Sequence, residues 1–114
     1  WIESGLAWIP FLMQRLVNEW MMRSSEVPLL KRKPSDYRRE MYFSTQPMEE
    51  PPDGRDLTDI FGWIGWDHVL FASDYPHVEG GSDFYGKFVN QLERFGAGVM
   101  EKFFVTNAEV LFPG

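Results

Sequence analysis

Cysteine is absent from this sequence of 114 residues. Disulfide bonds and thiol catalysis are therefore excluded, and we expect a cytoplasmic location, which a cysteine-free composition permits. No apolar run approaches the ~20 residues that a membrane-spanning helix needs, so we expect no membrane span. No signal peptide is visible at the start of the chain.

Positive charge is also scarce. Eleven Lys and Arg residues stand against seventeen Asp and Glu residues, which gives a formal net charge of −6. The one basic cluster, residues 31–33, is short and is typical of a solvated linker. We expect no nucleic-acid partner, because nucleic-acid binding depends largely on the neutralisation of phosphates by a broad basic face.

Strand candidates are few. Only residues 41–45 and about 68–73 favour a β-strand, and helical patterns separate them, which predicts a parallel sheet. Two parallel strands cannot form a sheet that is covered on both faces, and the chain begins at Trp1 rather than at a Met. We therefore expect the C-terminal part of a larger α/β protein, either a (β/α)8 barrel or an open doubly wound sheet. No glycine-rich phosphate loop follows either strand, which disfavours nucleotide binding.

Apolar residues recur at helical spacing in three segments, residues 8–22, 56–64 and 83–95. In the first segment the predicted inward stripe includes Ile9, Leu12, Met13, Leu16, Val17, Trp20 and Met21. Gly65 and Gly96 are expected to end the second and third helices.

Two shorter helical features are predicted from capping residues. Ser35 can cap a turn at residues 36–39. A short helix is predicted near residues 99–104, and Thr106 then opens a capping box with Glu109 for the last helix.

The most informative segment of the chain is Phe71-Ala72-Ser73-Asp74-Tyr75-Pro76-His77. The apolar run that begins at residue 68 leads directly to Asp74, and Pro76 stops it, as expected of a buried strand. A carboxylate at the end of such a strand is costly unless something binds it, and active sites of parallel barrels lie at the carboxyl ends of the strands. Asp74 is therefore a metal ligand, a catalytic carboxylate or a structural acid held by backbone amides.

Residues 70–77 resemble the eighth-strand signature of the amidohydrolase-related TIM barrels. That branch includes metal-dependent hydrolases and the aminocarboxymuconate-semialdehyde decarboxylase-like enzymes. Residues 106–112 are similar to the closing helix of the family, and residues 3–10 resemble the segment that leaves the sixth strand. The resemblance implies that residues 1–114 are the C-terminal part of one (β/α)8 barrel, with its last two strands and their helices.

The resemblance also implies roles for particular residues. Asp74 occupies the position of the acid that binds a divalent metal, usually zinc, and that can manage a proton on bound water. Glu3 stands where some decarboxylating relatives carry a His that acts as an acid or base, and His77 and Trp8 are candidates for contacts with a small-molecule substrate. The family's other ligands are a His-x-His pair and a further His on strands that this chain lacks. We therefore expect this chain alone to hold no metal tightly and to be inactive.

The other histidine of the chain, His68, is placed by its distance from Asp74 along the strand. His68 precedes Asp74 by six residues, which is about 20 Å along an extended strand. It therefore cannot share a metal with Asp74, and we expect it at the opposite end of the strand, in contact with a helix or the base of the barrel. His77 follows Asp74 by three residues and belongs to the same rim.

Functions of different classes remain open. The resemblance implies a metal-dependent hydrolase or non-oxidative decarboxylase that acts on a small carboxylated or cyclic substrate, and by analogy a homodimer. The alternative is a non-catalytic remnant or interaction module that pairs with another chain, or with the missing part of a barrel, through its aromatic surface. Carbohydrate binding through the Trp residues is a weaker reading, because their positions around predicted helices favour packing.

Overall fold

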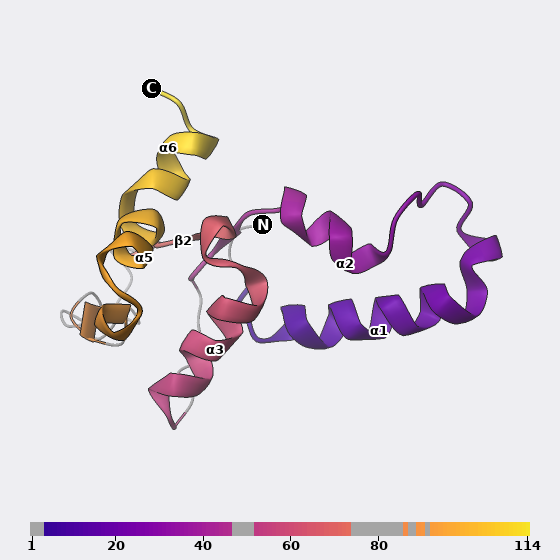
Figure 1. The fold of residues 1–114 in the computed structure, drawn as a ribbon, viewed down its shortest axis with the longest axis horizontal. Coiled ribbons are helices and arrows are strands. Elements are labelled where there is room, and N and C mark those ends of the chain that lie inside the picture. Colours follow the sequence, from indigo (N-terminus) through magenta and orange to yellow (C-terminus); the bar gives the residue numbers. More distant parts are fainter. Residues whose placement is uncertain (1–3, 47–51, 74–85, 87–88, 91) are drawn as a thin grey trace.

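The chain alternates helices with two short strands (Figure 1). This computed structural model describes residues 4–46, 52–73, 86, 89–90 and 92–114. The elements are α1 (Trp8–Arg23), η1 (Ser24–Glu26), α2 (Pro34–Tyr37), η2 (Arg38–Glu40), β1 (Phe43–Ser44), α3 (Gly54–Ile64), η3 (Trp66–His68), β2 (Val69–Leu70), η5 (Glu93–Phe95), α5 (Ala97–Glu101), η6 (Lys102–Thr106) and α6 (Asn107–Leu111).

The two strands pair in parallel, as the alternation of elements predicts. Phe43 lies opposite Val69 and Ser44 opposite Leu70. Both strands lie inside the segments that the sequence favours but are shorter than expected. The crossover between them contains α3, which is the usual way to connect parallel neighbours.

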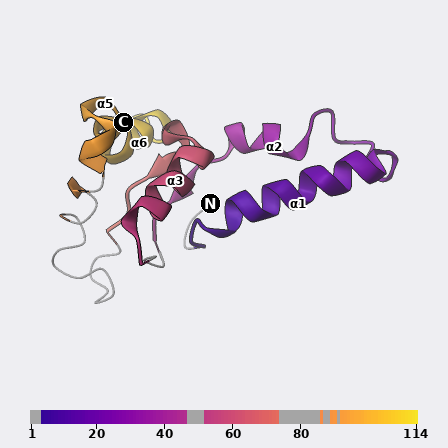
Figure 2. The same cartoon turned by 60° about the horizontal axis from the view of Figure 1, so that its bottom comes forward.

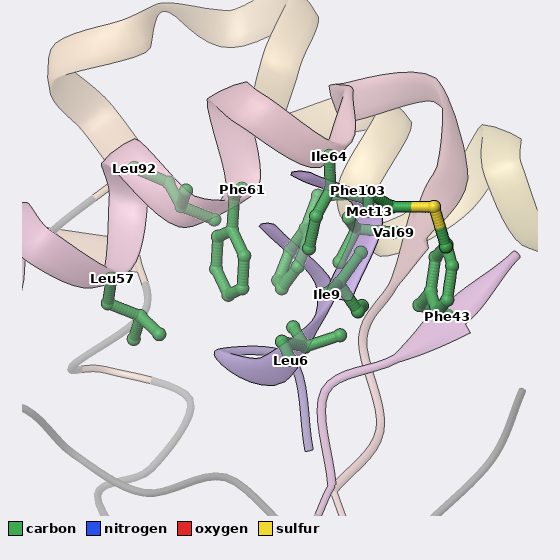
Figure 3. Packing of buried hydrophobic residues seen from close by; sticks show 10 residues of the cluster. All are labelled: Leu6, Ile9, Met13, Phe43, Leu57, Phe61, Ile64, Val69, Leu92 and Phe103. Carbon is green, nitrogen blue, oxygen red and sulfur yellow. The ribbon is translucent and has the colours of Figure 1, made fainter. Parts of the chain in front are cut away.

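The core lies between this small sheet and the helices. Ten buried apolar residues form one cluster, and Figure 3 shows how their side chains converge from α1, β1, α3, β2 and the C-terminal helices. Its members are Leu6, Ile9, Met13, Phe43, Leu57, Phe61, Ile64, Val69, Leu92 and Phe103. Because segments that are far apart in the sequence all contribute, the cluster fixes where the sheet lies relative to the helices.

Helix α1 lies where the apolar spacing over residues 8–22 predicts it, but only part of its predicted apolar stripe is buried. Ile9 and Met13 are buried, whereas 39% of Leu16 and 64% of Met21 is exposed. Figures 1 and 2 show why: α1 extends away from the sheet and runs alongside α2, so its C-terminal half lies beyond the core. Apolar periodicity identifies the face that could be buried, but another element must be present to cover that face.

The two predictions of residues that cap the start of a helix are wrong. The α2 helix begins at Pro34, after Lys33, so Ser35 lies inside it and does not cap it. Thr106 has helical backbone angles and no side-chain cap, because α5, the π-helical turn η6 and α6 follow one another without a break from Ala97 to Leu111. A capping box needs a non-helical first residue, and Thr106 is already inside a helix.

Helix α3 has the local signals that define both of its ends. The carboxylate of Asp53 accepts a hydrogen bond from the backbone N–H of Arg55 at 2.9 Å, and its other contacts with the Arg55 guanidinium form an ion pair. At the other end Gly65 has a φ of +109°, which a residue with a side chain rarely adopts. The sequence therefore predicts the end of this helix at Gly65 correctly.

The Asp53 cap predicts a pH dependence of α3. The Arg55 hydrogen bonds lower the pKa of Asp53 to about 2, below its ordinary value of 3.8. A lowered carboxyl pKa stabilises the folded chain above pH 3.8, and this contribution is lost as the pH falls towards 2. A titration of the Asp53 carboxyl carbon by NMR should therefore give a midpoint near 2. Asp53→Asn, which keeps a good cap, should remove this part of the acid sensitivity, and an unshifted midpoint near 3.8 would contradict the ion pair.

Candidate functional site

The carboxyl ends of β1 and β2 lie side by side, because the strands are parallel. The ladder continues past β1, where the Thr45 N–H donates to the Leu70 carbonyl at 3.1 Å. The Thr45 hydroxyl then accepts a hydrogen bond from the Ala72 N–H at 3.0 Å and lies 3.4 Å from the Ala72 carbonyl. Thr45 is fully buried, and its hydrogen bonds hold the backbone of the second strand as far as Ala72.

The two faces of the sheet differ in character. Phe43 and Val69 are buried in the core cluster and face the helices. Side chains alternate along an extended strand, so Ser44 of β1 shares the other face with Leu70 of β2. The sheet therefore directs the polar side chain of Ser44 away from the hydrophobic core.

The edge of β2 that faces away from β1 is covered by the C-terminal helices. The Asn107 side-chain amide donates to the carbonyls of Trp66 and Val69 at 2.6 and 2.8 Å. The Phe71 N–H donates to the Phe103 carbonyl at 3.1 Å. These bonds satisfy backbone groups that would otherwise form an open strand edge.

The amino-terminal end of β2 carries His68, as the distance argument predicts. His68 ends η3, directly before the strand, and its ring lies 5.2 Å from the ring of Tyr42, which precedes β1. The aromatic contact places His68 at the base of the two strands, opposite the edge formed by Thr45 and Ala72.

The predicted site residues are only partly covered by the structure. Asp74, Glu3 and His77 lie outside the described residues, so their roles stay predictions. Trp8 is described: its ring meets Phe43 edge-on with centroids 6.4 Å apart, and its indole N–H donates to the carbonyls of Ser4 and Gly5. These contacts account for Trp8 by packing, and a contact with substrate stays a prediction.

The described residues do not bring a set of metal ligands together. Within the described part of the chain, no group of three or more His, Cys, Asp or Glu residues could hold a metal ion. A zinc site needs three or four ligands. The described residues therefore do not fit a metal site by themselves, and the one predicted ligand, Asp74, follows Ser73 just beyond them.

These features define the class of the protein. Adjacent parallel strands, a helical crossover and a polar carboxyl edge are typical of α/β proteins whose sites lie at the strand ends. The chain matches the amidohydrolase family over residues 3–114, and it therefore belongs to that family, whose fold is a TIM barrel. A search of curated proteins finds no match. Among the described residues, no helix is long and apolar enough to cross a membrane.

Sequence reasoning missed two polar residues that shape this region. Thr45 ends the predicted first strand, and Asn107 lies in the predicted last helix. No motif marks their contacts. A buried polar side chain is costly without partners, so the burial of Thr45 and Asn107, which the structure shows, indicates specific contacts for both.

The Thr45 contact predicts a measurable loss of stability. Thr45→Val keeps the shape of the side chain but leaves the Ala72 N–H without its acceptor, at a cost of about 1–3 kcal/mol. Thr58→Val is the matched control, because Thr58 is equally buried and its hydroxyl donates only to the Arg55 carbonyl within α3. Urea unfolding should show the larger loss for Thr45→Val, and equal losses would contradict a specific role of Thr45.

Proposed function

We propose that this chain supplies the last two strands and the closing helices of an amidohydrolase barrel, and that Asp74 is its contribution to a divalent-metal site. The parallel pairing of β1 with β2 carries the proposal, because it brings two strand ends to one edge, and Asp74 follows one of them by four residues. The remaining strands and ligands would come from polypeptide outside these 114 residues.

The proposed reaction is hydrolysis or non-oxidative decarboxylation of a small carboxylated or cyclic substrate. A bound metal, with zinc as the expected ion, would supply Lewis-acid chemistry. Asp74 would hold the metal and Glu3 would move a proton, provided that burial raises its pKa. His77 and Trp8 would contact the substrate at the same rim.

A second proposal is favoured by the exposed apolar residues. Large fractions of Phe11, Leu29 and Phe112 are exposed, at 74%, 87% and 68% respectively. Such residues are typical of surfaces that another polypeptide covers. In the non-catalytic alternative, this chain would pair through them with a second chain or with the other part of a split barrel.

Metal analysis of the complete gene product tests the enzymatic proposal. We expect the purified protein to hold a stoichiometric divalent metal and Asp74→Asn to lose most of that metal and the activity that depends on it. Asp56→Asn is the control, because Asp56 is an exposed carboxylate in the first turn of α3. A complete protein without metal, or an Asp74→Asn variant with unchanged metal content, would contradict the proposal. The non-catalytic alternative predicts no metal in either protein.

A further inference from the structure

The end of α1 and the segment that follows it form an arm with an exposed apolar tip. Every residue from 21 to 33, which we call the arm tip, is exposed. Figures 1 and 2 both show this part of the chain projecting away from the sheet and from the other helices. Its apolar side chains are Met21, Met22, Val27, Leu29 and Leu30. Exposed apolar side chains that gather in one place indicate an interaction surface.

The arm tip also differs in charge from the rest of the chain. It holds four Lys and Arg residues and one Glu, a formal charge of +3, whereas the other 101 residues hold seven basic and sixteen acidic residues, a formal charge of −9. Arg32 pairs with Glu40, but Arg23, Lys31 and Lys33 form no ion pair within the described part of the chain. A partner for the arm tip should therefore combine apolar side chains with negative charge.

The C-terminal helices carry a surface with this combination. Glu101 and Glu109 are exposed in the helical run from Ala97 to Leu111, and neither forms an ion pair with a described residue. Lys102, the basic residue of this run, already pairs with Asp67. The exposed apolar residues beside the two carboxylates are Val105, Val110, Leu111 and Phe112. We call these four residues, with Glu101 and Glu109, the C-terminal surface.

The arm tip and the C-terminal surface lie at opposite ends of the molecule, as both Figure 1 and Figure 2 show. They are therefore separated within one copy of this chain. Two copies that lie side by side in opposite directions bring each arm tip to the C-terminal surface of the other copy. The two contacts are then equivalent, as in a two-fold symmetric dimer, and the pair closes without leaving either surface free.

An anionic membrane is a weaker candidate for the same arm tip. Its lipid head groups would attract the exposed cations, but they would repel the rest of the chain, whose formal charge is −9. A membrane would also leave the C-terminal surface uncovered. A second copy of the chain satisfies the apolar and the charged parts of both surfaces together.

We propose that this protein forms a two-fold dimer in which the arm tip of each copy docks on the C-terminal surface of the other. Burial of apolar side chains from both surfaces stabilises the contact. The cations of the arm tip lie near Glu101 and Glu109 of the other copy and set the register of the pair. This inference holds for an enzyme and for a non-catalytic module alike, because it involves neither Asp74 nor a metal.

Sedimentation equilibrium of the complete gene product tests the inference. We expect a dimer that weakens about tenfold between about 50 and about 500 mM NaCl, because salt screens the contact. Lys31→Glu combined with Lys33→Glu should weaken it about a hundredfold, and so should Glu101→Lys combined with Glu109→Lys, because like charges then meet. An equal mixture of these two double variants should regain about the original affinity, since each reversed surface meets its opposite.

Two single variants provide a comparison matched in charge. Lys31→Gln and Gln14→Glu change the net charge by the same amount, and both positions are exposed, but Gln14 lies on α1 outside the arm tip. Only Lys31→Gln should weaken the dimer. Leu29→Ser tests the apolar part of the contact and should also weaken the dimer, while its thermal unfolding should stay unchanged because Leu29 is exposed.

Three results would overturn the inference. The first is a complete gene product that stays monomeric, and the second is a mixture of the double variants that does not regain affinity. The third is a monomer whose arm tip binds vesicles of phosphatidylglycerol, since this would assign the arm tip to a membrane. Thermal unfolding of each variant identifies loss of fold. Metal content, measured on the same samples, reports on Asp74 separately, so the two proposals can fail independently.

Discussion

Replacing Phe61 with Ala is expected to lower the free energy of unfolding by about 3–5 kcal/mol, the usual cost of removing a buried phenyl ring. Phe61 is fully buried at the middle of the core cluster (Figure 3). Its ring centroid lies 5.7 Å from those of Trp66 and Phe103, with the Trp66 ring nearly perpendicular. The substitution therefore removes apolar burial and two aromatic contacts. It also leaves a cavity between α3 and the C-terminal helices.

Urea unfolding followed by circular dichroism measures this loss. Phe112→Ala is the control, since 68% of Phe112 is exposed and its truncation should change stability by less than about 0.5 kcal/mol. The total stability of a domain is only about 5–15 kcal/mol, so Phe61→Ala should unfold a large fraction of the chain at modest urea concentrations. Equal midpoints for the two variants would show that Phe61 is not central to the core.

Asn107→Asp is expected to cost about as much, at roughly 3–5 kcal/mol near neutral pH. Asn107 is 95% buried, since only 5% of it is exposed, and its amide donates to two backbone carbonyls. A carboxylate of the same shape has no donor, so it would face the carbonyl oxygens of Trp66 and Val69 with a buried negative charge. The docking of α6 against the base of β2 should weaken accordingly.

The sign of the pH dependence separates charge from shape. Burial would raise the pKa of the new carboxyl above its ordinary value near 3.9. The folded variant would then bind more protons than the unfolded variant, and its stability should fall as the pH rises through this range. At low pH the protonated carboxyl can donate one of the two lost hydrogen bonds, so the variant should recover part of its stability.

Two further variants complete this comparison. Asn107→Leu removes both donors without adding charge, so it should be destabilised without the same pH dependence. Asn18→Asp adds a carboxylate at an exposed position on α1 and should be close to neutral. A finding that Asn107→Asp is as stable as Asn18→Asp would contradict the hydrogen bonds assigned to Asn107.

The parts of the fold that could be predicted from the sequence are those with local causes. Helix α3 follows from its apolar spacing and from Gly65, whose positive φ ends it. The parallel pairing of the strands follows from their alternation with helices. The membership of the amidohydrolase family follows from motifs near residues 70–77 and 106–112, and the match over residues 3–114 confirms it.

The parts that could not be predicted depend on contacts between distant segments. The apolar stripe of α1 gives no indication that Leu16 and Met21 lie beyond the reach of the core. The sequence around Thr106 fits a capping box, yet the helix is already formed from Ala97 onwards. The Asn107 side chain donates to the carbonyls of Trp66 and Val69, and this contact depends on where β2 lies.

For the candidate site, the sequence identified residues that the structure does not describe, namely Asp74, Glu3 and His77. The structure instead shows the role of Thr45, which belongs to no motif. Its importance depends on burial and on hydrogen bonds to the second strand, and neither can be read from one segment alone.

The C-terminal helices and a further strand compete for the same backbone groups. The Val69 carbonyl accepts a hydrogen bond from the Asn107 side chain, and the Phe71 N–H donates one to the Phe103 carbonyl. Through these two backbone groups β2 would join another strand on that side. A further strand could pair with β2 on that side only if the Phe71 bond to Phe103 were exchanged for an inter-strand bond. In the described part of the chain, the helical segment from Ala97 to Leu111 therefore ends the sheet at β2.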